Sequence, residues 1–367
     1  MRTDVLVVGG GPAGIATAIA ASLKGLRVTV VDARKPPIDK PCGEGLLPEA
    51  VSVLHHLGIR LTPDVAFPFA GFCFLDGRSS AVAPITSGTA FGVRRTVLHR
   101  LLVKRALETG VSLLWGTHVS RFGRVEVHTN AGPLSYRWLI GADGNPSSVR
   151  RFAGLEPRRQ TRFRFGFRRH YAVAPWTDRV EVHWGDKCQM VVAPTGPREI
   201  CVSAFTGDSH LRLERAMQQF PEVAERIAGA QPLSSEAGAV TLLSRARAVT
   251  HDNIALVGDA SCTVDGIAGQ GLSLAFRQAL QLADVLAHGD LSSYESTHRR
   301  IIREPVRMTR LLLALNASAA LRRRVLRLFA GKPALFAKMI SAHTGASAPG
   351  ALNAGALLEL GWRVMWA

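Results

Sequence analysis

The sequence predicts an α/β fold with some α+β character, in which a parallel sheet flanked by helices is joined to an inserted, mostly antiparallel sheet and a helical C-terminal region. Three observations near the N-terminus carry this prediction. Residues 3–8 form a near-continuous apolar run, as in strands that are buried on both faces. A glycine-rich turn at residues 9–14 follows at once, and an alanine-rich helix at 15–24 leads to a second apolar run at 26–31. A strand, a helix and a second buried strand make a βαβ unit, which is typical of parallel sheets.

The later segments alternate between helical and strand-like patterns. In the first half of the chain we expect a helix from Pro48 to Gly58, strands and turns over 65–92, a helix over 94–110 and a small β-meander over 111–141. In the second half we expect strands over 162–205, a helical segment over 209–229, a buried strand over 254–257, a long helix over 271–288 and helices over 292–340. The strand-rich stretch in the middle of the chain predicts a second, largely antiparallel layer.

The chain is long and strongly basic. Its 367 residues favour two to three domains, and 45 Lys and Arg against 28 Asp and Glu give a formal charge of +17. Such a charge attracts an anionic cofactor or substrate, an acidic carrier protein or an anionic membrane surface, although an arginine-rich proteome would also explain it. No nucleic-acid-binding module is visible, so we expect no nucleic-acid partner.

The five cysteines are scattered and form no CxxC pair. Because we also see no signal peptide before the first strand, we expect a reducing, cytoplasmic setting. No apolar run reaches the ~18 to 20 residues of a membrane span, so any bilayer contact would be peripheral, at the inner membrane face.

The turn at residues 9–14 has the spacing Gly9-x-Gly11-x-x-Gly14. Gly9 permits the tight turn, Gly11 lets the backbone approach a phosphate, and Gly14 allows the following helix to pack closely. Asp32 ends the second strand 18 residues after Gly14, close to the ~20 expected of an acid that binds ribose hydroxyls. The segment therefore predicts a Rossmann-like dinucleotide-binding unit in which the helix N-terminus holds the pyrophosphate.

Two further segments bear on which dinucleotide is bound. Residues 138–150 (WLIGADGNPSSVR) resemble the second fingerprint of the flavoprotein hydroxylases, and residues 258–261 (GDAS), with 269–272 (GQGL) after them, resemble their ribityl-binding motif. The carboxylate of Asp259 would accept hydrogen bonds from ribityl hydroxyls, and the helix that opens at residue 269 would stabilise negative charge on a reduced flavin. The resemblance implies FAD as the cofactor.

The resemblance covers most of the chain. It is to the superfamily of FAD-dependent oxidoreductases that includes the aromatic hydroxylases, which are group A flavoprotein monooxygenases, and the geranylgeranyl reductases. Residues 40–46 and 264–276 resemble a bacterial subgroup associated with polyketide and quinone biosynthesis. The likeness implies an FAD-binding domain of the glutathione-reductase type with an inserted substrate domain. The implied divisions are 1–70, 94–155 and 246–290 for the discontinuous FAD-binding domain, 71–93 and 156–245 for the substrate domain, and 291–367 for the basic helical C-terminal region.

The motifs and the resemblance together predict a set of cofactor-binding residues. They are Gly9, Gly11, Pro12, Ala13, Gly14, Asp32, Ala33, Arg34, Cys42, Gly43, Arg95, Val119, Asp143, Gly258, Asp259, Gly269, Gln270, Gly271 and Leu272. For Arg34 and Arg95 the alternative interpretation is a solvated surface position. By family analogy Cys42 would line the flavin site, with a buried, inert thiol as the alternative.

Other catalytic signatures are missing from the sequence. The 12 histidines show no HExxH or paired Cys/His spacing, so we expect no metal site, and no GxSxG elbow is present. We therefore assign no catalytic residue and expect the flavin to carry the chemistry. Because no second GxGxxG segment exists, the reductant would be NAD(P)H docked transiently, or a partner reductase. Cys262, Asp265 and Gly266 depart from the hydroxylase pattern, so we expect substrate placement at the flavin to differ.

Three functions follow from the resemblance. We favour a monooxygenase, driven by NAD(P)H, that hydroxylates an aromatic, phenolic or polyketide-like substrate through a flavin C4a-hydroperoxide. The first alternative is a reductase or dehydrogenase of the geranylgeranyl-reductase kind that acts on an isoprenoid or other lipid double bond. The second is a flavoprotein maturation factor that acts on a partner protein. The enzymatic alternatives imply a lipophilic or aromatic small-molecule substrate, and we expect a monomer or weak dimer.

The C-terminal helices are basic. Between Arg299 and Lys338 the only acidic residue is Glu304, and apolar residues are interleaved with the arginines. Such helices would lie on an anionic membrane and give access to a lipophilic substrate. The alternative is a helical cap whose arginine face points into solvent.

Overall fold

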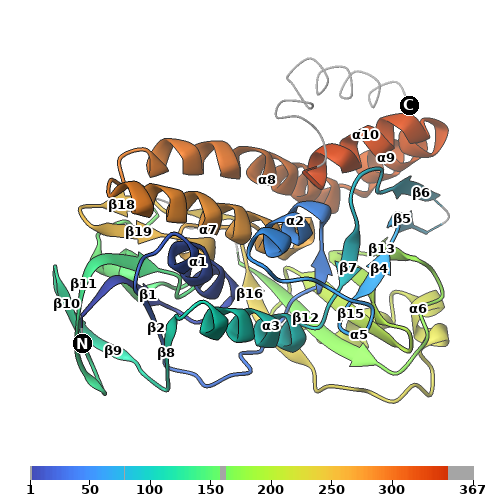
Figure 1. The fold of residues 1–367 in the computed structure, drawn as a ribbon. Coiled ribbons are helices and arrows are strands. Elements are labelled where there is room, and N and C mark those ends of the chain that lie inside the picture. The colour runs from blue at the N-terminus through green and yellow to red at the C-terminus, as the bar shows by residue number, and fades with distance from the viewer. Residues whose placement is uncertain (1, 78, 158–162, 346–367) are drawn as a thin grey trace.

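A computed structural model describes residues 2–77, 79–157 and 163–345 of the chain. Its first large sheet has eight strands, and β8, β2, β1, β11 and β19 lie side by side in that order and run parallel (Figure 1). The strands of this sheet are β1 (Arg2–Val8), β2 (Val28–Asp32), β8 (Ser112–Trp115), β9 (Val119–Phe122), β10 (Glu126–Thr129), β11 (Gly132–Gly141), β18 (Thr250–His251) and β19 (Ile254–Leu256). The apolar residues of β1 and β2 are mostly buried, because the sheet is covered by other elements.

The helix that follows β1 forms the centre of the first core. α1 (Pro12–Leu23) is rich in alanine and is buried along most of its length, so it lies close to the sheet and packs against both α3 (Arg95–Glu108) and α7 (Gly271–His288). α2 (Pro48–His56) packs against α7 as well. A short α4 (Ser148–Phe152) follows β11.

The second large sheet has seven strands in the order β16-β12-β15-β14-β13-β5-β6, and all neighbours are antiparallel except β13 and β5. Its strands are β5 (Gly71–Asp76), β6 (Ser79–Pro84), β12 (Arg164–Tyr171), β13 (Arg179–Trp184), β14 (Cys188–Gly196), β15 (Glu199–Thr206) and β16 (Ala237–Thr241). Alternate side chains enter opposite cores: on β14, Met190 and Val192 pack towards α5 (Leu213–Met217) and α6 (Pro221–Arg226). Val191 and Ala193 pack on the face covered by the C-terminal helices.

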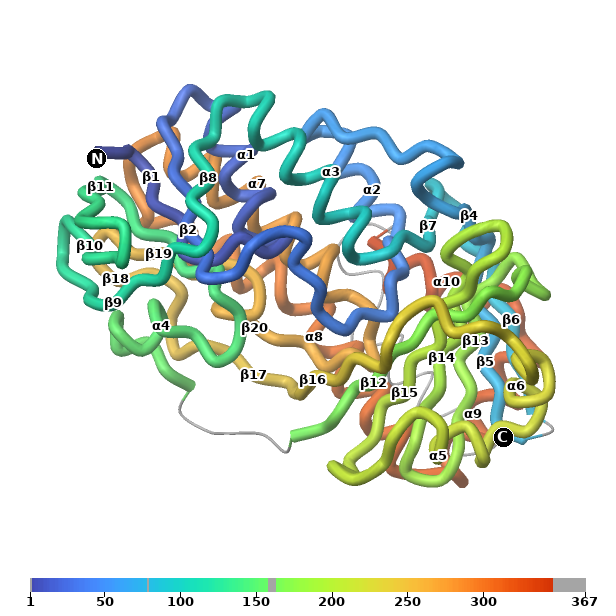
Figure 2. Tube along the Cα trace, turned by 90° about the horizontal axis from the view of Figure 1, so that it is seen from below, coloured from blue at the N-terminus to red at the C-terminus, as the bar shows by residue number. Residues whose placement is uncertain are grey.

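Three helices cover that second face. They are α8 (Tyr294–Ala317), α9 (Ala319–Gly331) and α10 (Pro333–His343), and their apolar side chains form one buried cluster with those of β5, β6, β13 and β14. Figure 2 shows the two large sheets towards opposite ends of the molecule, with α8 running between them.

Two small sheets lie at the junction. β3 (Gly45–Leu46), β7 (Ala90–Gly92) and β4 (Phe67–Phe69) make a three-stranded sheet, and β17 (Ser244–Arg245) pairs with β20 (Cys262–Thr263). A Cβ added at Gly92 would lie 1.6 Å from the carbonyl oxygen of Pro194, so β7 runs directly against β14. The three-stranded sheet therefore contacts the second large sheet through β7 and β14.

The predicted fold class is confirmed, and two predicted elements need correction. Of the segment 111–141, only β9, β10 and β11 form the expected meander. The first strand of the segment, β8, instead joins the parallel sheet beside β2. The helical segment expected over 209–229 is two short helices, because Pro221 cannot donate a backbone hydrogen bond and starts a new helix. The last residues of the predicted C-terminal region, 346–367, lie outside the described residues.

The packing of α1 on the glycine turn generates a stability prediction. A Cβ at residue 14 would lie 1.9 Å from the carbonyl oxygen of Gly9, so Gly14→Ala should force the backbone apart and lower the free energy of unfolding by about 1–3 kcal/mol. Gly11→Ala is the matched control, because its Cβ would meet no heavy atom within 4 Å. Chemical denaturation of the protein without bound dinucleotide measures both; equal stability of the two variants would contradict the packing described here.

Candidate cofactor and substrate site

The glycine turn connects the end of β1 to α1. Gly9 has φ +112°, and a Cβ there would lie 2.3 Å from the carbonyl oxygen of Ala142, so β1 and β11 meet closely at this point. No side chain caps α1, whose N-cap residue is Gly11, and Pro12 and Ala13 form its first turn. The free backbone N–H groups of a helix start are a site for an anion such as a pyrophosphate.

Several of the predicted glycines are not covered by other parts of the chain that the structure describes. A Cβ added at Gly11, Gly43, Gly269 or Gly271 would meet no heavy atom within 4 Å, although these residues come from three separate segments. A bound group can therefore approach the backbone at each of these motif positions, which is compatible with FAD.

Asp32 ties the glycine turn to the end of β2. Its Oδ2 accepts a hydrogen bond from Gly10 N at 2.7 Å, and its Oδ1 accepts one from Arg34 N at 2.8 Å. Each carboxylate oxygen keeps a lone pair for a ribose hydroxyl. Ala33 and the Arg34 side chain are exposed, in agreement with the surface alternative for Arg34. Val119 begins β9, just beyond the loop that follows β8.

The Gly258-Asp259 segment forms a short 3-10 helix, η1 (Gly258–Ala260), directly after β19. Gln278 of α7 fixes this turn, because its Oε1 accepts from Gly258 N at 2.7 Å. Asp259 forms an ion pair with Lys40, whose Nζ lies 2.7 Å from Asp259 Oδ2. Sequence reasoning missed both Gln278 and Lys40; Lys40 lies in the 40–46 segment that carries the family likeness.

A buried histidine supports the same turn. His298 Nε2 lies 3.0 Å from Gln278 Nε2 and 3.1 Å from Ser261 Oγ. Burial lowers the pKa of His298 to about 4, so its imidazole is neutral near pH 7 and Nε2 can accept from the Gln278 amide. The η1 turn is therefore held by a hydrogen-bonded network within the protein.

Asp143 has a local role in the structure. Its carboxylate accepts hydrogen bonds from Ser147 Oγ at 2.5 Å and from Ser148 N at 2.6 Å, at the start of α4. Burial raises the pKa of Asp143, and these donors oppose the rise. With its carboxylate engaged in this way, Asp143 would approach a cofactor through its backbone.

The 269–272 segment opens α7. Gly269 has φ +63°, Gln270 is the N-cap residue, and Gly271 and Leu272 begin the helix without a side-chain cap. Gln270 donates from Nε2 to the carbonyl oxygen of His343, so the end of α10 lies against this segment. Just before it, Asp265 caps η2 (Gly266–Ala268) and pairs with Arg164 of β12 at 2.6 Å.

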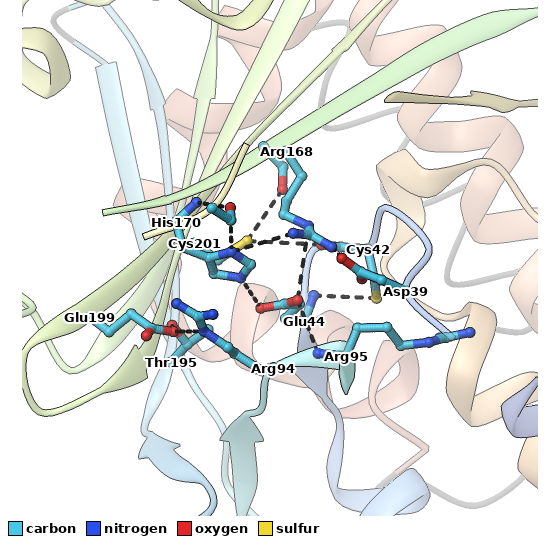
Figure 3. Close-up of polar contacts among 12 residues, drawn as sticks. Asp39, Cys42, Glu44, Arg94, Arg95, Arg168, His170, Thr195, Glu199 and Cys201 are labelled. Atoms are coloured by element: carbon cyan, nitrogen blue, oxygen red, sulfur yellow. Dashed lines mark hydrogen bonds and ion pairs between the residues drawn. The ribbon is translucent and has the colours of Figure 1, made fainter. Parts of the chain in front are cut away.

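Arg94 and Arg95 have different roles at the start of α3. Arg94 Nε donates to Glu199 Oε1 at 2.7 Å, which occupies its side chain. Arg95 donates from its backbone N to Glu44, while among the described residues its buried Nε has no hydrogen-bond partner. Figure 3 shows its guanidinium directed away from Glu44. Arg95 is thus the better placed of the two to bind an anionic group.

The loop of Cys42 and Gly43 leads into a buried polar cluster (Figure 3). Glu44 is 2% exposed, and its Oε2 lies 2.5 Å from His170 Nε2 on β12. Arg168 of the same strand pairs with Asp39 at 2.6 Å. The Cys42 Sγ accepts from Glu44 N at 3.3 Å, and burial raises the pKa of this thiol, which favours the inert form at neutral pH.

Three side chains of this cluster lie as close together as metal ligands do. Ligand atoms of Glu44, His170 and Cys201 are all within 4.8 Å of one another. Burial raises the pKa of the Cys201 thiol well above its usual value, and a metal-binding thiol must lose its proton. Glu44 and His170 are hydrogen-bonded to each other, while the Cys201 thiol donates to the carbonyl oxygen of Cys42. The expectation that the protein has no metal site remains a prediction.

Several known proteins are similar to this chain in sequence, two of them over most of its length. "Menaquinone reductase" of Mycolicibacterium smegmatis is 28% identical over 337 residues, which is 83% of this chain and 81% of that protein. "Digeranylgeranylglycerophospholipid reductase 2" of Methanopyrus kandleri is 27% identical over 74% of each chain. "3-(3-hydroxy-phenyl)propionate/3-hydroxycinnamic acid hydroxylase" of Mycolicibacterium gilvum is 33% identical over 169 residues, which is 41% of this chain and 29% of that protein.

The fold is shared as well. A crystal structure of a flavoprotein/dehydrogenase from Cytophaga hutchinsonii superimposes with a TM-score of 0.79 at 21% identity, covering 93% of this chain and 92% of that one. Together with the cradle of three motifs, these findings define the protein as an FAD-dependent oxidoreductase. The family described as "FAD binding domain" matches residues 2–292, and the chain belongs to it.

The position of Asp259 generates a prediction about cofactor content. Asp259→Ala removes a charged hydrogen-bond acceptor, which is worth about 1.5–3 kcal/mol, so FAD should bind about 10- to 100-fold more weakly. Asp284→Ala is the matched control, because Asp284 also pairs with a lysine, Lys24 at 2.8 Å, on the outer side of α7. The ratio of flavin absorbance to protein absorbance measures occupancy. Full FAD occupancy in Asp259→Ala would show that this carboxylate does not bind the cofactor.

Proposed function

We propose that the protein is a reductase that adds hydrogen across a double bond of an unsaturated isoprenoid lipid, with FAD as the hydride carrier. The observation that carries this proposal is the extent of the sequence likeness. The two reductases match about three quarters or more of both chains, whereas the hydroxylase matches less than half of this one. This changes the preference derived from the sequence, which favoured a monooxygenase.

The residues that would hold FAD come from five segments. The start of α1 would bind the pyrophosphate, Asp32 the ribose, and Asp259 the ribityl chain, with the start of α7 and Arg95 near the isoalloxazine end. When bound, FAD would supply hydride transfer at N5. NAD(P)H docked transiently, or a partner reductase, is the proposed source of the hydride.

An apolar layer supports a lipophilic substrate. Ile267 and Ala268 of η2, next to the proposed flavin position, belong to the same buried cluster as Phe74, Trp184 and Phe336. The layer therefore continues from the cofactor segment into the packed interface between the second sheet and the C-terminal helices. A hydrocarbon chain that binds beside this layer would exchange water for apolar neighbours and keep water away from the reacting carbon atoms.

The C-terminal helices bear on how such a lipid is reached. Among the described residues, no helix is long and apolar enough to cross a membrane. Arg324 and Arg327 of α9 are exposed, while its apolar side chains are buried in the cluster below. We keep the proposed peripheral contact with an anionic membrane, and it would be electrostatic in character, since few apolar side chains of α9 remain free to insert.

Two other functions stay open as alternatives. The hydroxylase likeness favours a monooxygenase acting on an aromatic or phenolic substrate, and a maturation factor acting on a partner protein is the third. The apolar layer fits an aromatic substrate as well as an isoprenoid one, so the products of the reaction must separate them.

Mass spectrometry of products tests the proposal. The FAD-loaded protein, reduced anaerobically, is incubated with menaquinone and, separately, with digeranylgeranylglycerophospholipid in detergent. The expected result, once air has reoxidised any quinol ring, is a lipid whose isoprenoid chain carries two more hydrogen atoms, located by its fragment masses, with the gain reduced in Asp259→Ala. A parallel incubation in air with phenolic substrates covers the alternative. A phenolic product that has gained one oxygen atom, with both lipids unchanged, would overturn the reductase proposal in favour of hydroxylation.

A further inference from the structure

Glu44 is held in an unusual way for a carboxylate. It is 2% exposed and has φ +60°, a backbone conformation that is unfavourable for a residue with a side chain. Burying a carboxylate also costs free energy unless hydrogen bonds compensate. Two such costs at one residue, in the loop beside the proposed flavin site, call for a role beyond filling space.

The contacts of His170 form a directed chain of hydrogen bonds. Ser234 Oγ accepts from the backbone N of His170 at 3.1 Å, which leaves the hydroxyl hydrogen free to donate to His170 Nδ1 at 3.0 Å. The opposite ring nitrogen, Nε2, then carries the hydrogen that it donates to Glu44 Oε2 at 2.5 Å. Every link of this chain, from hydroxyl to carboxylate, can carry an exchangeable proton.

The two ends of the chain face different surroundings. Ser234 is half-buried, on the solvent side, and His170 is 2% exposed. At the other end, Glu44 lies next to Gly43, where an added Cβ would meet no heavy atom within 4 Å. Glu44 Oε1 accepts from Arg95 N at 3.0 Å, so this end of the chain contacts two predicted cofactor-binding residues, Gly43 as its neighbour in sequence and Arg95 through this hydrogen bond.

Arginine side chains hold the chain in place without carrying protons themselves. Arg168 NH1 lies 3.4 Å from His170 Nδ1, and Arg168 Nε lies 3.9 Å from Glu44 Oε1. Arginine stays protonated at all ordinary pH values, so it orients and offsets charge here. The titratable and charged groups around the pair are Asp39, Cys42, Arg94, Arg95, Arg168 and Cys201.

We propose that Ser234, His170 and Glu44 form a proton relay between solvent and the flavin site. The inference rests on the proposed function. Reduction of a carbon–carbon double bond needs a hydride on one carbon and a proton on the other, which the electron pair of the double bond binds. The hydride comes from reduced FAD, which is oxidised, and the relay delivers the proton from Glu44. His170 and Ser234 then return a proton to Glu44 from solvent.

The pH dependence of the FAD midpoint potential tests the relay without any lipid. If Glu44 and His170 take up one proton when the flavin is reduced, the midpoint potential of FAD falls by about 30 mV more per pH unit. For a two-electron couple, this is a tenfold change in the equilibrium constant of reduction per pH unit. Glu44→Gln should lose this part of the slope. Glu181→Gln is the matched control, because Glu181 also pairs with a histidine of low exposure, His183 at 2.9 Å, on β13. A wild-type slope in Glu44→Gln with FAD bound would overturn the relay.

Ser234→Ala provides the second test, and it applies even if Glu44→Gln fails to bind FAD. This variant leaves the Glu44 loop intact and disconnects His170 from solvent. A pH-indicator dye then follows proton uptake during photoreduction of bound FAD, which should slow about tenfold or more. An unchanged rate would contradict the relay. Because neither test contains a lipid, altered proton uptake with no lipid reduction would reject the reductase proposal alone.

Discussion

The contact between Glu44 and His170 is the interaction on which the arrangement of the site depends. His170 belongs to the second large sheet, while Glu44 lies in the loop that leads into β3 and receives a hydrogen bond from the first residue of α3. A buried carboxylate without these donors would be costly, so the loop and β12 must stay together. The loop therefore lies between the sheet that would bind FAD and the sheet that would bind substrate.

The proposed FAD-binding segments are positioned by close packing within the first large sheet and its helices. Gly14 allows α1 to approach β1, and the η1 turn is fixed from α7 by Gln278. Lys40 connects the same loop to Asp259, so the loop that meets the second sheet also meets the turn that would hold the ribityl chain. In the proposed function, cofactor binding and substrate placement would in this way be linked through residues 40–45.

The sequence was informative wherever the signal was local. The βαβ unit was predictable because the glycines, the buried strands and Asp32 all lie within one short stretch. The Glu44–His170 contact was not, because its partners are 126 residues apart and no local pattern pairs them. The likeness at residues 40–46 pointed to the loop, yet Glu44 itself was not selected. A further signal existed in β12, where Arg164, Arg168 and His170 are polar residues in a buried strand.

The proposed reductase requires that reduced FAD in this protein reacts with an isoprenoid lipid rather than with oxygen. Stopped-flow absorbance measures this directly when the anaerobically reduced flavoprotein is mixed with digeranylgeranylglycerophospholipid, which carries isoprenoid double bonds but no quinone ring, or with oxygenated buffer. The lipid should reoxidise the flavin faster than oxygen does, without a transient absorbing species in the oxygen reaction. Rapid reoxidation by oxygen through such a transient species, with the lipid leaving the flavin reduced, would contradict it.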